Sequence, residues 1–354
     1  MLIKPEIKKF ARIKVVGVGG GGSNAIRNMM EAQDIQGVEF IAINTDAQAL
    51  SVCPAPTKIQ IGTKLTGGLG SGGNPEVGRE AAEESADQIH EHLAETDMVF
   101  LTTGEGGGTG SGATPVIADI AKGEGALTVA VATKPFGFEG GRRMMVAEEG
   151  LRELKEKVDA LITIPNDKLL EVVDESASLL EAFRAADEVL GRSVQGISDI
   201  IVVPGLVNRD FADVKTIMQN AGSALMGIGH SEGENRALEA AKQAIESPLL
   251  ESSIHGAKGV LFNITAGENL RLSEVNKAAK MIAEAADPSA NIIFGAAVDE
   301  NLGEQLKITI IATGFDANKQ RKEQLKKVRE EIFSQDEGVE TEEELEMPAF
   351  MRRK

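Results

Sequence analysis

The chain has 354 residues, enough to bury a sizeable core and to form two domains, and it carries a formal net charge of −18 from 55 acidic and 37 basic side chains. That charge argues against nucleic-acid binding through a general basic surface, and the single Cys53 excludes an intramolecular disulfide and a cysteine-cluster metal site. The N-terminus has no apolar signal segment, and no apolar run approaches the roughly 18 residues of a membrane helix, so we expect a soluble, cytoplasmic protein.

The first half of the chain alternates between strand and helix patterns. Strands are predicted over residues 13–18, 38–44, 59–61, 98–101, 127–133 and 161–164. Helices are predicted after the first strand to about residue 32, from Pro75 to about residue 92, and from Pro115 onward. Strands that alternate with helices favour a parallel sheet covered on both faces.

Three glycine-rich segments lie between a predicted strand and a predicted helix, at residues 19–24, 67–73 and 104–112. The last has six glycines in nine residues, more than a plain turn needs. Glycine lets backbone amides approach a ligand closely, and a helix N-terminus adds a favourable dipole for anions. In a parallel sheet such segments meet at one edge, beyond the carboxyl ends of the strands. They predict a site for a ligand with several negative charges, such as a nucleoside di- or triphosphate.

A long buried helix is predicted from the capping box of Ser178 and Glu181 to the Pro204-Gly205 pair. Asp187 interrupts its apolar stripe, and a solitary buried carboxylate is costly without a partner. Either it lies at the edge of the stripe and pairs with Arg184 or Arg192, or it accepts hydrogen bonds from a ligand such as guanine.

Asp210 and Asp213 stand at the start of the next predicted helix. Their spacing alone favours an acidic helix cap. The alternative interpretation is that they polarise a water molecule or assist a cation.

A smaller α/β domain is predicted from about residue 224, with helices at 234–245 and 273–286 and strands at 259–265, 291–298 and 307–313. Residues 316–329 are highly charged, and residues 336–346 hold seven acids, a composition typical of disorder. Residues 347–354 place a short apolar cluster beside three cations. They predict either a docking peptide or an unstructured terminus.

Two rival functions are compatible with parts of this pattern. Residues 17–22 fit G-x-G-x-x-G and Asp46 could bind a ribose, which would suit an NAD-dependent oxidoreductase but leaves the other two glycine-rich segments unexplained. A scaffold that binds nucleotide and polymerises without turnover is the second rival. The chain has no Gly-Lys dipeptide, which excludes a P-loop NTPase.

Residues 106–112, GGGTGSG, resemble the signature of the tubulin/FtsZ family. Further stretches add to the resemblance: residues 17–25, 44–46, 68–78, 133–136, 164–169 and 208–213. The resemblance covers about residues 10–315 and 348–353. Within the family, the chain resembles the bacterial cell-division branch most. It implies a tubulin-like α/β fold whose parts are a parallel-sheet GTP-binding domain (1–177), a long central helix (178–203), a synergy loop with the following helix (204–223), a smaller α/β C-terminal domain (224–315), a charged linker (316–346) and a partner-docking peptide (347–354).

The resemblance also implies a GTP or GDP site. The residues that would bind the nucleotide are Gly20, Gly21, Gly22, Ser23, Asn24, Asn44, Gly70, Ser71, Gly72, Gly107, Gly108, Thr109, Gly110, Glu139, Arg143, Asn166, Phe183 and Asp187. The glycine-rich segments would cradle the phosphates. Glu139 and Arg143 would hold the ribose and nearby phosphate. Asn166 and Asp187 would bind guanine, and Phe183 would stack on it.

Catalysis would depend on a second copy of the chain. The resemblance implies that Asn208, Asp210 and Asp213 enter the nucleotide site of the next subunit and polarise the attacking water, while Mg²⁺ screens the phosphates. No side chain is predicted as a direct metal ligand. Hydrolysis would then require head-to-tail assembly into filaments.

The expected partners are other copies of the chain and, through residues 347–354, membrane-tethering and regulatory division proteins such as the actin-like FtsA. No nucleic-acid partner is expected, and membrane contact would be indirect. The expected location is the cytoplasm, at the mid-cell division ring.

Overall fold

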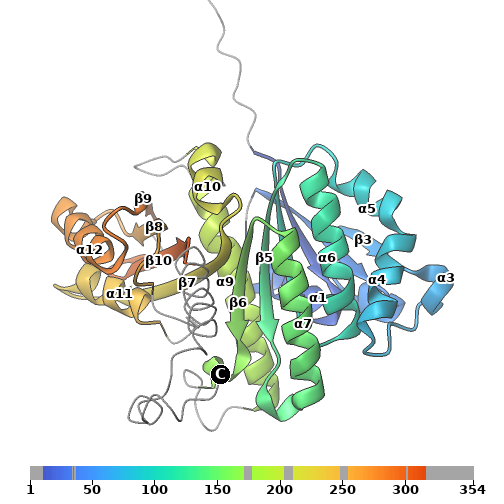
Figure 1. Cartoon of the computed structure of the whole chain (residues 1–354). Helices are drawn as coiled ribbons and strands as arrows, with labels where there is room; N and C mark the ends of the chain where they lie inside the picture. Colours follow the sequence, from blue (N-terminus) through green and yellow to red (C-terminus); the bar gives the residue numbers. More distant parts are fainter. Residues whose placement is uncertain are drawn as a thin grey trace, which may run out of the picture. The chain divides into compact units, whose positions relative to one another are not determined.

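The chain is described from a computed structural model that covers residues 11–33, 35, 37–170, 178–202, 210–247, 254–299 and 302–315 (Figure 1). All of these residues except Phe315 belong to one structural unit, residues 1–314. The predicted linker and docking peptide lie outside the described residues.

Ten strands of the described residues form one sheet in the order β3-β2-β1-β4-β5-β6-β7-β10-β8-β9. The parallel part contains β1 (Ile13–Val18), β2 (Val38–Asn44), β3 (Thr57–Gln60), β4 (Met98–Gly104), β5 (Leu127–Lys134) and β6 (Ala160–Pro165). The second part contains β7 (Gly222–Ser231), β8 (Gly259–Ala266), β9 (Asn291–Val298) and β10 (Leu306–Thr313). There, β10 pairs antiparallel with β7 and β8, and β8 pairs parallel with β9. The predicted α/β fold class is confirmed.

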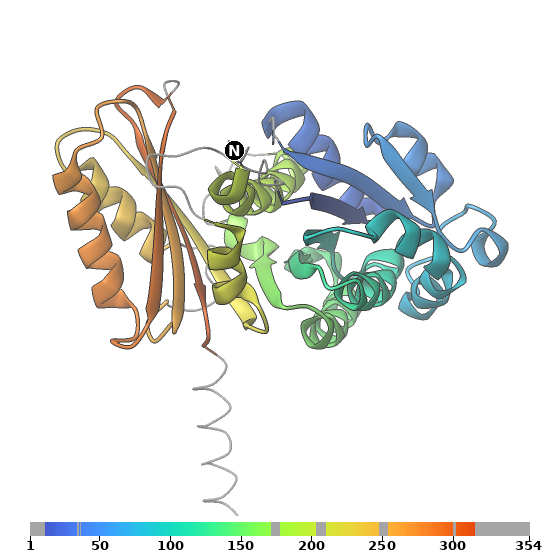
Figure 2. The ribbon, with the colours of Figure 1, turned by 90° about the horizontal axis from the view of Figure 1, so that it is seen from above.

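The helices cover both faces of the parallel strands (Figure 2). The first part of the chain contains α1 (Gly19–Asn28) with the π-turn η1 (Met29–Gln33), α2 (Ala47–Val52), α3 (Thr63–Thr66), α4 (Pro75–Glu84), α5 (Ala86–Leu93), α6 (Gly108–Gly123), the 3₁₀ turn η2 (Gly137–Glu139), α7 (Gly141–Lys157) and α8 (Asn166–Leu169). After these come α9 (Leu179–Val202), α10 (Phe211–Met218), α11 (Arg236–Ile245) and α12 (Leu272–Ala285). Figure 2 shows α11 and α12 on one side of the second part of the sheet.

Alternate residues along each parallel strand enter two separate cores. Val15 packs with residues of α1 and α9, whereas its neighbour Val16 packs with residues of α4, α5, α6 and α7. Phe100 and Leu101 divide in the same way. Successive residues of a strand point to opposite faces of the sheet, so a strand buried on both faces needs apolar residues at odd and even positions alike. This is why these segments are almost continuously apolar in the sequence.

Local signals place the helix starts as predicted in two cases. Ser178 N–H donates to Glu181 Oε2 (2.6 Å), and Glu181 N–H donates to Ser178 Oγ (3.3 Å), which forms the expected capping box of α9. Asn74 Oδ1 accepts from Glu76 N–H (3.1 Å) at the start of α4. The helix predicted to reach about residue 92 is interrupted at Ser85, so that α4 and α5 are separate.

Two glycine-rich segments are helical where loops were predicted. The first turns of α1 and α6 begin at Gly19 and Gly108, and Pro115 lies inside α6. Intrinsic propensity disfavours glycine in a helix by about 1 kcal/mol per residue relative to alanine, and here tertiary packing overrides it. A Cβ on Gly22 would lie 2.4 Å from the carbonyl oxygen of Thr102. Strand β7, also missed from the sequence, combines three glycines with few β-branched residues.

Asp159 joins the two parts of the sheet. Strands β6 and β7 pair only over residues 160–162 and 222–224. The buried Asp159 carboxylate accepts from Thr128 N–H on β5 (2.9 Å) and from Asn220 N–H just before β7 (3.2 Å). Lys122 Nζ lies 3.5 Å from the same carboxylate. One side chain therefore fixes the entry of the chain into β7.

We expect Asp159→Ala to lower the free energy of unfolding by about 2–4 kcal/mol, because each buried amide without an acceptor costs about 1–3 kcal/mol. Urea unfolding followed by circular dichroism measures this change. The matched control is Asp119→Ala, which removes an exposed ion pair with Lys157 (3.1 Å) and should change stability by less than about 0.5 kcal/mol. Equal effects of the two substitutions would contradict the role of Asp159.

Candidate functional site

Glycines at the carboxyl edge of the parallel strands have two different roles. A Cβ on Gly20 or Gly107 would meet no atom within 4 Å, so these backbones face open space. In contrast, a Cβ on Gly110 would lie 2.6 Å from the carbonyl oxygen of Gly104, and Gly22 is packed in the same way against β4. The packed glycines let α1 and α6 approach the strands closely. The open ones leave first-turn amides, which have no intrahelical partner, available to an anion.

The third glycine-rich segment, residues 67–73, is a true loop. Its glycines at positions 67, 68, 70, 72 and 73 have positive φ angles. Ser71 Oγ lies 3.0 Å from Thr109 Oγ1, which in turn lies 2.7 Å from Thr45 Oγ1. This chain of hydroxyl groups connects the loop to the first turn of α6 and to the end of β2.

Two adjoining cavities open at this edge. The first, the glycine cavity, has a volume of about 520 Å³ and is lined by Gly72, Gly73, Gly106, Gly107, Gly108, Glu139, Arg142, Arg143 and Val146. The second, the Asp187 cavity, has a volume of about 180 Å³ and is lined by Gly21, Asn24, Gly104, Glu105, Thr133, Pro135, Glu139, Arg143, Asn166, Phe183, Ala186, Asp187 and Leu190. They share Glu139 and Arg143. The structure thus brings together predicted residues from α1, α6, α7, α8 and α9.

Glu139 and Arg143 form the boundary between the two cavities. Glu139 Oε1 accepts from Phe136 N–H (2.9 Å), and Glu139 Oε2 lies 2.8 Å from Arg143 Nη1. The Glu139 side chain is almost buried, whereas that of Arg143 is half exposed. The buried carboxylate therefore orients a guanidinium whose remaining donors can meet an anionic ligand.

Asp187 is a largely buried carboxylate on α9. Burial raises its pKa from 3.8 to about 7, and the positive charge of Arg27 opposes only part of this shift. The alternative that Asp187 pairs with Arg184 or Arg192 at the edge of the stripe is not supported, because Arg192 pairs with Glu188 and no ion pair between Asp187 and Arg184 is present among the described residues. In the described part of the chain Asp187 has no hydrogen bond or ion pair, so it is a strong acceptor without a donor.

Phe183 and Asn166 complete the Asp187 cavity. The ring of Phe183 meets Phe136 edge to face, with centroids 5.4 Å apart, and remains partly exposed, which leaves a ring face for stacking. Among the described residues, the buried Asn166 Oδ1 has no hydrogen-bond partner. Such groups are rare in folded proteins and mark places where a ligand can supply the missing donor.

Eight of the predicted nucleotide-binding residues line neither cavity: Gly20, Gly22, Ser23, Asn44, Gly70, Ser71, Thr109 and Gly110. Ser23 is buried, and its Oγ donates to the carbonyl oxygen of Gly19 (2.8 Å). Asn44 is buried, and its Oδ1 accepts from Asp46 N–H (3.3 Å). Both side chains stabilise the backbone beside the site.

Asp210 and Asp213 lie at the other end of the strands. Asp210 precedes α10, and Asp213 N–H donates to its carbonyl oxygen (2.9 Å). The C-terminal end of α10 is followed by Asn220, which Asp159 binds at the amino end of β6. Figure 1 shows α10 at the end of the sheet opposite to the arrowheads of β5 and β6. The structure therefore does not bring these acids to the cavities of their own chain. Asn208, predicted to act with them, lies outside the described residues.

Glu105 is a functional candidate that the sequence did not reveal. It lies inside the glycine-rich segment, fully buried, and neither carboxylate oxygen has a hydrogen-bond partner of good geometry in the ranges that the structure describes. A Cβ on Gly150 would lie 2.5 Å from its Oε2. Burial raises the pKa of Glu105 from 4.5 to about 7; nearby Ser111 lowers it, and the charge of Glu153 raises it. Burial of this side chain depends on the packing of α7, which no local pattern predicts.

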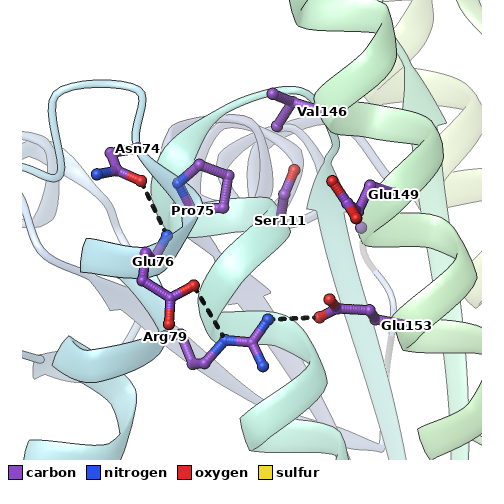
Figure 3. A pocket seen from close by; sticks show the side chains of 9 residues that line it. Asn74, Pro75, Glu76, Arg79, Ser111, Val146, Glu149 and Glu153 are labelled. Carbon is purple, nitrogen blue, oxygen red and sulfur yellow. Dashed lines mark hydrogen bonds and ion pairs between the residues drawn. The ribbon is translucent and has the colours of Figure 1, made fainter.

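Ser111 connects Glu105 to a further cavity between α4, α6 and α7 (Figure 3). Its Oγ accepts from Gly106 N–H (2.9 Å) and so supports the wall of the glycine cavity. The further cavity has a volume of about 310 Å³, and Arg79 crosses it to Glu153 (2.7 Å). Its main charges are therefore already paired with one another.

The described residues contain no group of three or more His, Cys, Asp or Glu side chains that could hold a metal ion. A divalent cation at this edge would need oxygen ligands from a bound anion. Within the same residues, no helix combines the length and apolar character required to cross a bilayer.

Comparison with known proteins gives consistent matches along the chain. A model of the GTPase domain of the tubulin/FtsZ family matches residues 12–174, and a model of the FtsZ family C-terminal domain matches residues 222–316. An empty FtsZ dimer from M. jannaschii is 48% identical, with 88% of this chain and 90% of that chain covered and a TM-score of 0.83. A point mutant of FtsZ from the same organism matches with 48% identity, coverage of 88% and 93%, and a TM-score of 0.83. CetZ2 from Haloferax volcanii, in a GTPγS-bound protofilament, shares the fold at 20% identity, coverage of 85% and 92%, and a TM-score of 0.74.

We expect Glu105→Gln to stabilise the ligand-free protein at pH 8 but not at pH 5. Because the folded-state pKa is raised, the folded protein keeps a proton that the unfolded chain loses, so wild-type stability falls as pH rises from about 4.5 to about 7. Glutamine removes that penalty, worth about 3 kcal/mol at most at 1.36 kcal/mol per pKa unit. Urea unfolding at both pH values measures the difference. The exposed Glu149→Gln serves as the control, and equal stability of Glu105→Gln and wild type at pH 8 would refute the buried charge.

Proposed function

Because the chain belongs to the tubulin/FtsZ family, we propose that it is an FtsZ-type GTPase that assembles head to tail into cell-division filaments, each contact between subunits completing one hydrolytic site. One observation carries the proposal: the anion-binding cavities and the acids Asp210 and Asp213 lie at opposite ends of the same unit. The self-association of its relatives as dimers and protofilaments supports assembly.

GTP or GDP would occupy the two adjoining cavities. The phosphates would bind the amides of Gly107 and Gly108 in the glycine cavity and those of Gly20 and Gly21 beside it, where helix dipoles and Arg143 favour negative charge. Gly70, Ser71, Gly72 and Thr109 would close this cradle from the loop side. The ribose would lie at Glu139 and Arg143, which both cavities share.

The Asp187 cavity would select guanine. The ionised Asp187 carboxylate can accept from the ring N1–H and the 2-amino group of guanine, and Phe183 offers a ring face for stacking. Adenine has an acceptor at N1, so it would leave the buried carboxylate without donors. An unsatisfied buried charge is expensive enough to reject the wrong base.

The acids of one subunit would act on the nucleotide of the next. Helix α9 has 24 residues, about 36 Å at 1.5 Å per residue, and runs from the Asp187 cavity to Gly37 at the amino end of β2. The acids follow its far end, so they cannot reach their own nucleotide. A second copy stacked head to tail would bring its Asp210 and Asp213, with Asn208, to the open face of the glycine cavity. Such a heterologous contact continues into a filament.

Once there, the carboxylates would orient and polarise the water that attacks the terminal phosphate. Mg²⁺, when bound to the phosphates, would neutralise charge that develops on them. The site fits this arrangement, since Ser71 and Thr109 offer hydroxyl groups beside the glycine cavity and the described residues contain no carboxylate cluster. Mg²⁺ commonly keeps most of its water and binds through substrate phosphates.

The family match favours a GTPase over the NAD-dependent oxidoreductase considered from the sequence. Asp46, the residue proposed to bind a ribose, instead caps α2 by accepting from Gln48 N–H (2.8 Å) and Ala49 N–H (3.1 Å). The scaffold without turnover is tested by hydrolysis itself: filaments that pellet with GTP but release no phosphate would select it.

The proposal extends to cell biology through the resemblance. Residues 347–354 would dock membrane-tethering and regulatory division proteins, with residues 316–346 as the linker, and the filament would form the cytoplasmic mid-cell ring. The two similar structures at 48% identity come from M. jannaschii, so the bacterial origin stays a prediction from the sequence.

We expect GTP binding to weaken about tenfold between pH 8 and pH 6, since guanine needs the ionised Asp187 and its pKa is about 7 in the ligand-free protein. Asp187→Asn should lower the affinity at pH 8 by about 10- to 100-fold and reduce this dependence on pH, because it removes a charged acceptor. Calorimetric titration measures both. Glu188→Gln, on the same helix, is the control, and an unchanged pH profile in Asp187→Asn would contradict the assignment.

A mixture of two inactive variants should regain GTPase activity. Asp213→Ala should bind GTP without hydrolysing it, and Asp187→Asn should bind poorly but supply intact acids. In an equimolar random filament about one contact in four joins an intact cavity to intact acids, so about a quarter of the wild-type rate should return. Phosphate release at a GTP concentration that fills only the Asp213→Ala cavity measures this. If the mixture releases phosphate only at the sum of the rates of the two separate variants, a site shared between subunits would be excluded.

A further inference from the structure

Three hydroxyl groups in series join the end of β2 to the edge of the glycine cavity. Thr45 Oγ1 lies 2.7 Å from Thr109 Oγ1, and Thr109 Oγ1 lies 3.0 Å from Ser71 Oγ. We call Thr45, Thr109 and Ser71 the hydroxyl chain. Thr45 directly follows β2, Thr109 lies in the first turn of α6, and Ser71 belongs to the loop of residues 67–73. Side chains therefore link three segments that converge on the proposed phosphate position.

The two ends of the hydroxyl chain differ in their access to solvent. Thr45 is 0% exposed and Thr109 is buried, whereas Ser71 is half-buried. Within the described residues, Thr45 Oγ1 has no hydrogen-bond partner other than Thr109 Oγ1. Ser71 Oγ lies beside Gly108, where a Cβ would come within 2.3 Å of it, and Gly108 lines the glycine cavity. The hydroxyl chain thus runs from a closed end at Thr45 to an open end at Ser71.

Burial of Thr45 sets the direction of these hydrogen bonds. A hydroxyl group has one hydrogen to donate and lone pairs that accept. If Ser71 donated to Thr109 and Thr109 donated to Thr45, the hydrogen of Thr45 would be buried without an acceptor. In the opposite order Thr45 donates to Thr109, Thr109 donates to Ser71, and the remaining hydrogen is that of Ser71, at the open end. The second order is favoured, because a buried donor without an acceptor is costly and an accessible one can meet water.

We propose that Thr45 is a positioning residue for the phosphates: it orients the hydroxyl chain so that Ser71 presents an O–H donor, rather than lone pairs, to a phosphate oxygen. This inference rests on the proposed binding of GTP or GDP. Anionic oxygens are acceptors only, and hydrogen bonds to a charged group are stronger than those between neutral groups. Neighbouring hydrogen bonds in a series also strengthen one another. Thr45 therefore acts on the ligand through Thr109 and Ser71 without touching it.

The test removes the closed end of the hydroxyl chain with little change of shape. Thr45→Val keeps the branched side chain but has no hydroxyl group, so the order can reverse and Ser71 can donate inward to Thr109. We expect the affinity of the full chain for GTPγS, a slowly hydrolysed analogue of GTP, to fall about three- to tenfold in calorimetric titration. Thr45→Ser keeps the hydroxyl group and should bind GTPγS within about twofold of wild type. Equal losses in the two variants would indicate a packing effect and overturn the inference.

A double-mutant cycle tests whether Thr45 acts through Thr109. Thr109→Val removes the middle of the hydroxyl chain and should itself weaken the binding of GTPγS. In that background Thr45→Val should change the affinity by less than about twofold, because Thr45 then has no hydroxyl group to orient. Losses that add in full would overturn the inference. Ser71→Ala, outside the core, should weaken binding about three- to tenfold, and an unchanged affinity in this variant would overturn it as well.

The outcomes separate this inference from the proposed function. If wild type does not bind GTPγS, the proposed function fails. If wild type binds it and Thr45→Val binds it equally well, the proposed function stands and the inference fails. Urea unfolding without nucleotide checks that each variant is folded. Should Thr45→Val not fold, Thr45→Cys takes its place: it has the shape of Thr45→Ser but only a weak S–H donor, so it should lose affinity where Thr45→Ser does not.

Discussion

The site depends on how closely two helices approach the parallel strands. Gly22 of α1 and Gly110 of α6 lie against the backbone of β4, where a Cβ would come within 2.4 and 2.6 Å of carbonyl oxygens. This contact brings the first turns of both helices to the carboxyl edge of the sheet, where that of α6 lines the glycine cavity and that of α1 lines the Asp187 cavity. The hydroxyl groups of Ser71, Thr109 and Thr45 then fix the third segment against them. Without that close packing the loops would remain rich in glycine but would not converge.

Two buried carboxylates give the site its electrostatic character. Burial raises the pKa of both Asp187 and Glu105 to about 7, so each one stabilises the ligand-free fold less as it ionises. Ionisation of Asp187 and ionisation of Glu105 have opposite effects on nucleotide binding. Asp187 must be ionised to accept hydrogen bonds from guanine, whereas Glu105 lies behind the phosphate-facing loop, where a bound polyanion favours its neutral form. Ligand sites commonly contain groups of this kind, which lower the stability of the ligand-free fold.

The sequence predicted the strands other than β7, the capping box of α9 and the α/β class, because these depend on local patterns of apolar and capping residues. It did not predict that Gly19–Gly22 and Gly108–Gly112 are helical turns, since only contacts with β4 and α4 override their weak propensity. The cavities contain most of the expected residues, but Ser23 and Asn44 bind backbone instead. Glu105 was missed because its significance arises from burial by distant elements. The domain boundaries and the roles of Asn208, Asp210 and Asp213 stay predictions.

The link at Asp159 has a consequence for how the two halves of the chain can exist. Strand β7 pairs with β6 over three residues, and the Asp159 carboxylate holds the amide that leads into it. If residues 222–316 were produced alone, β7 would lose this three-residue pairing and become an edge strand. Exposed edge strands invite pairing with another copy. The first half thus acts as an intramolecular shield against aggregation of the second.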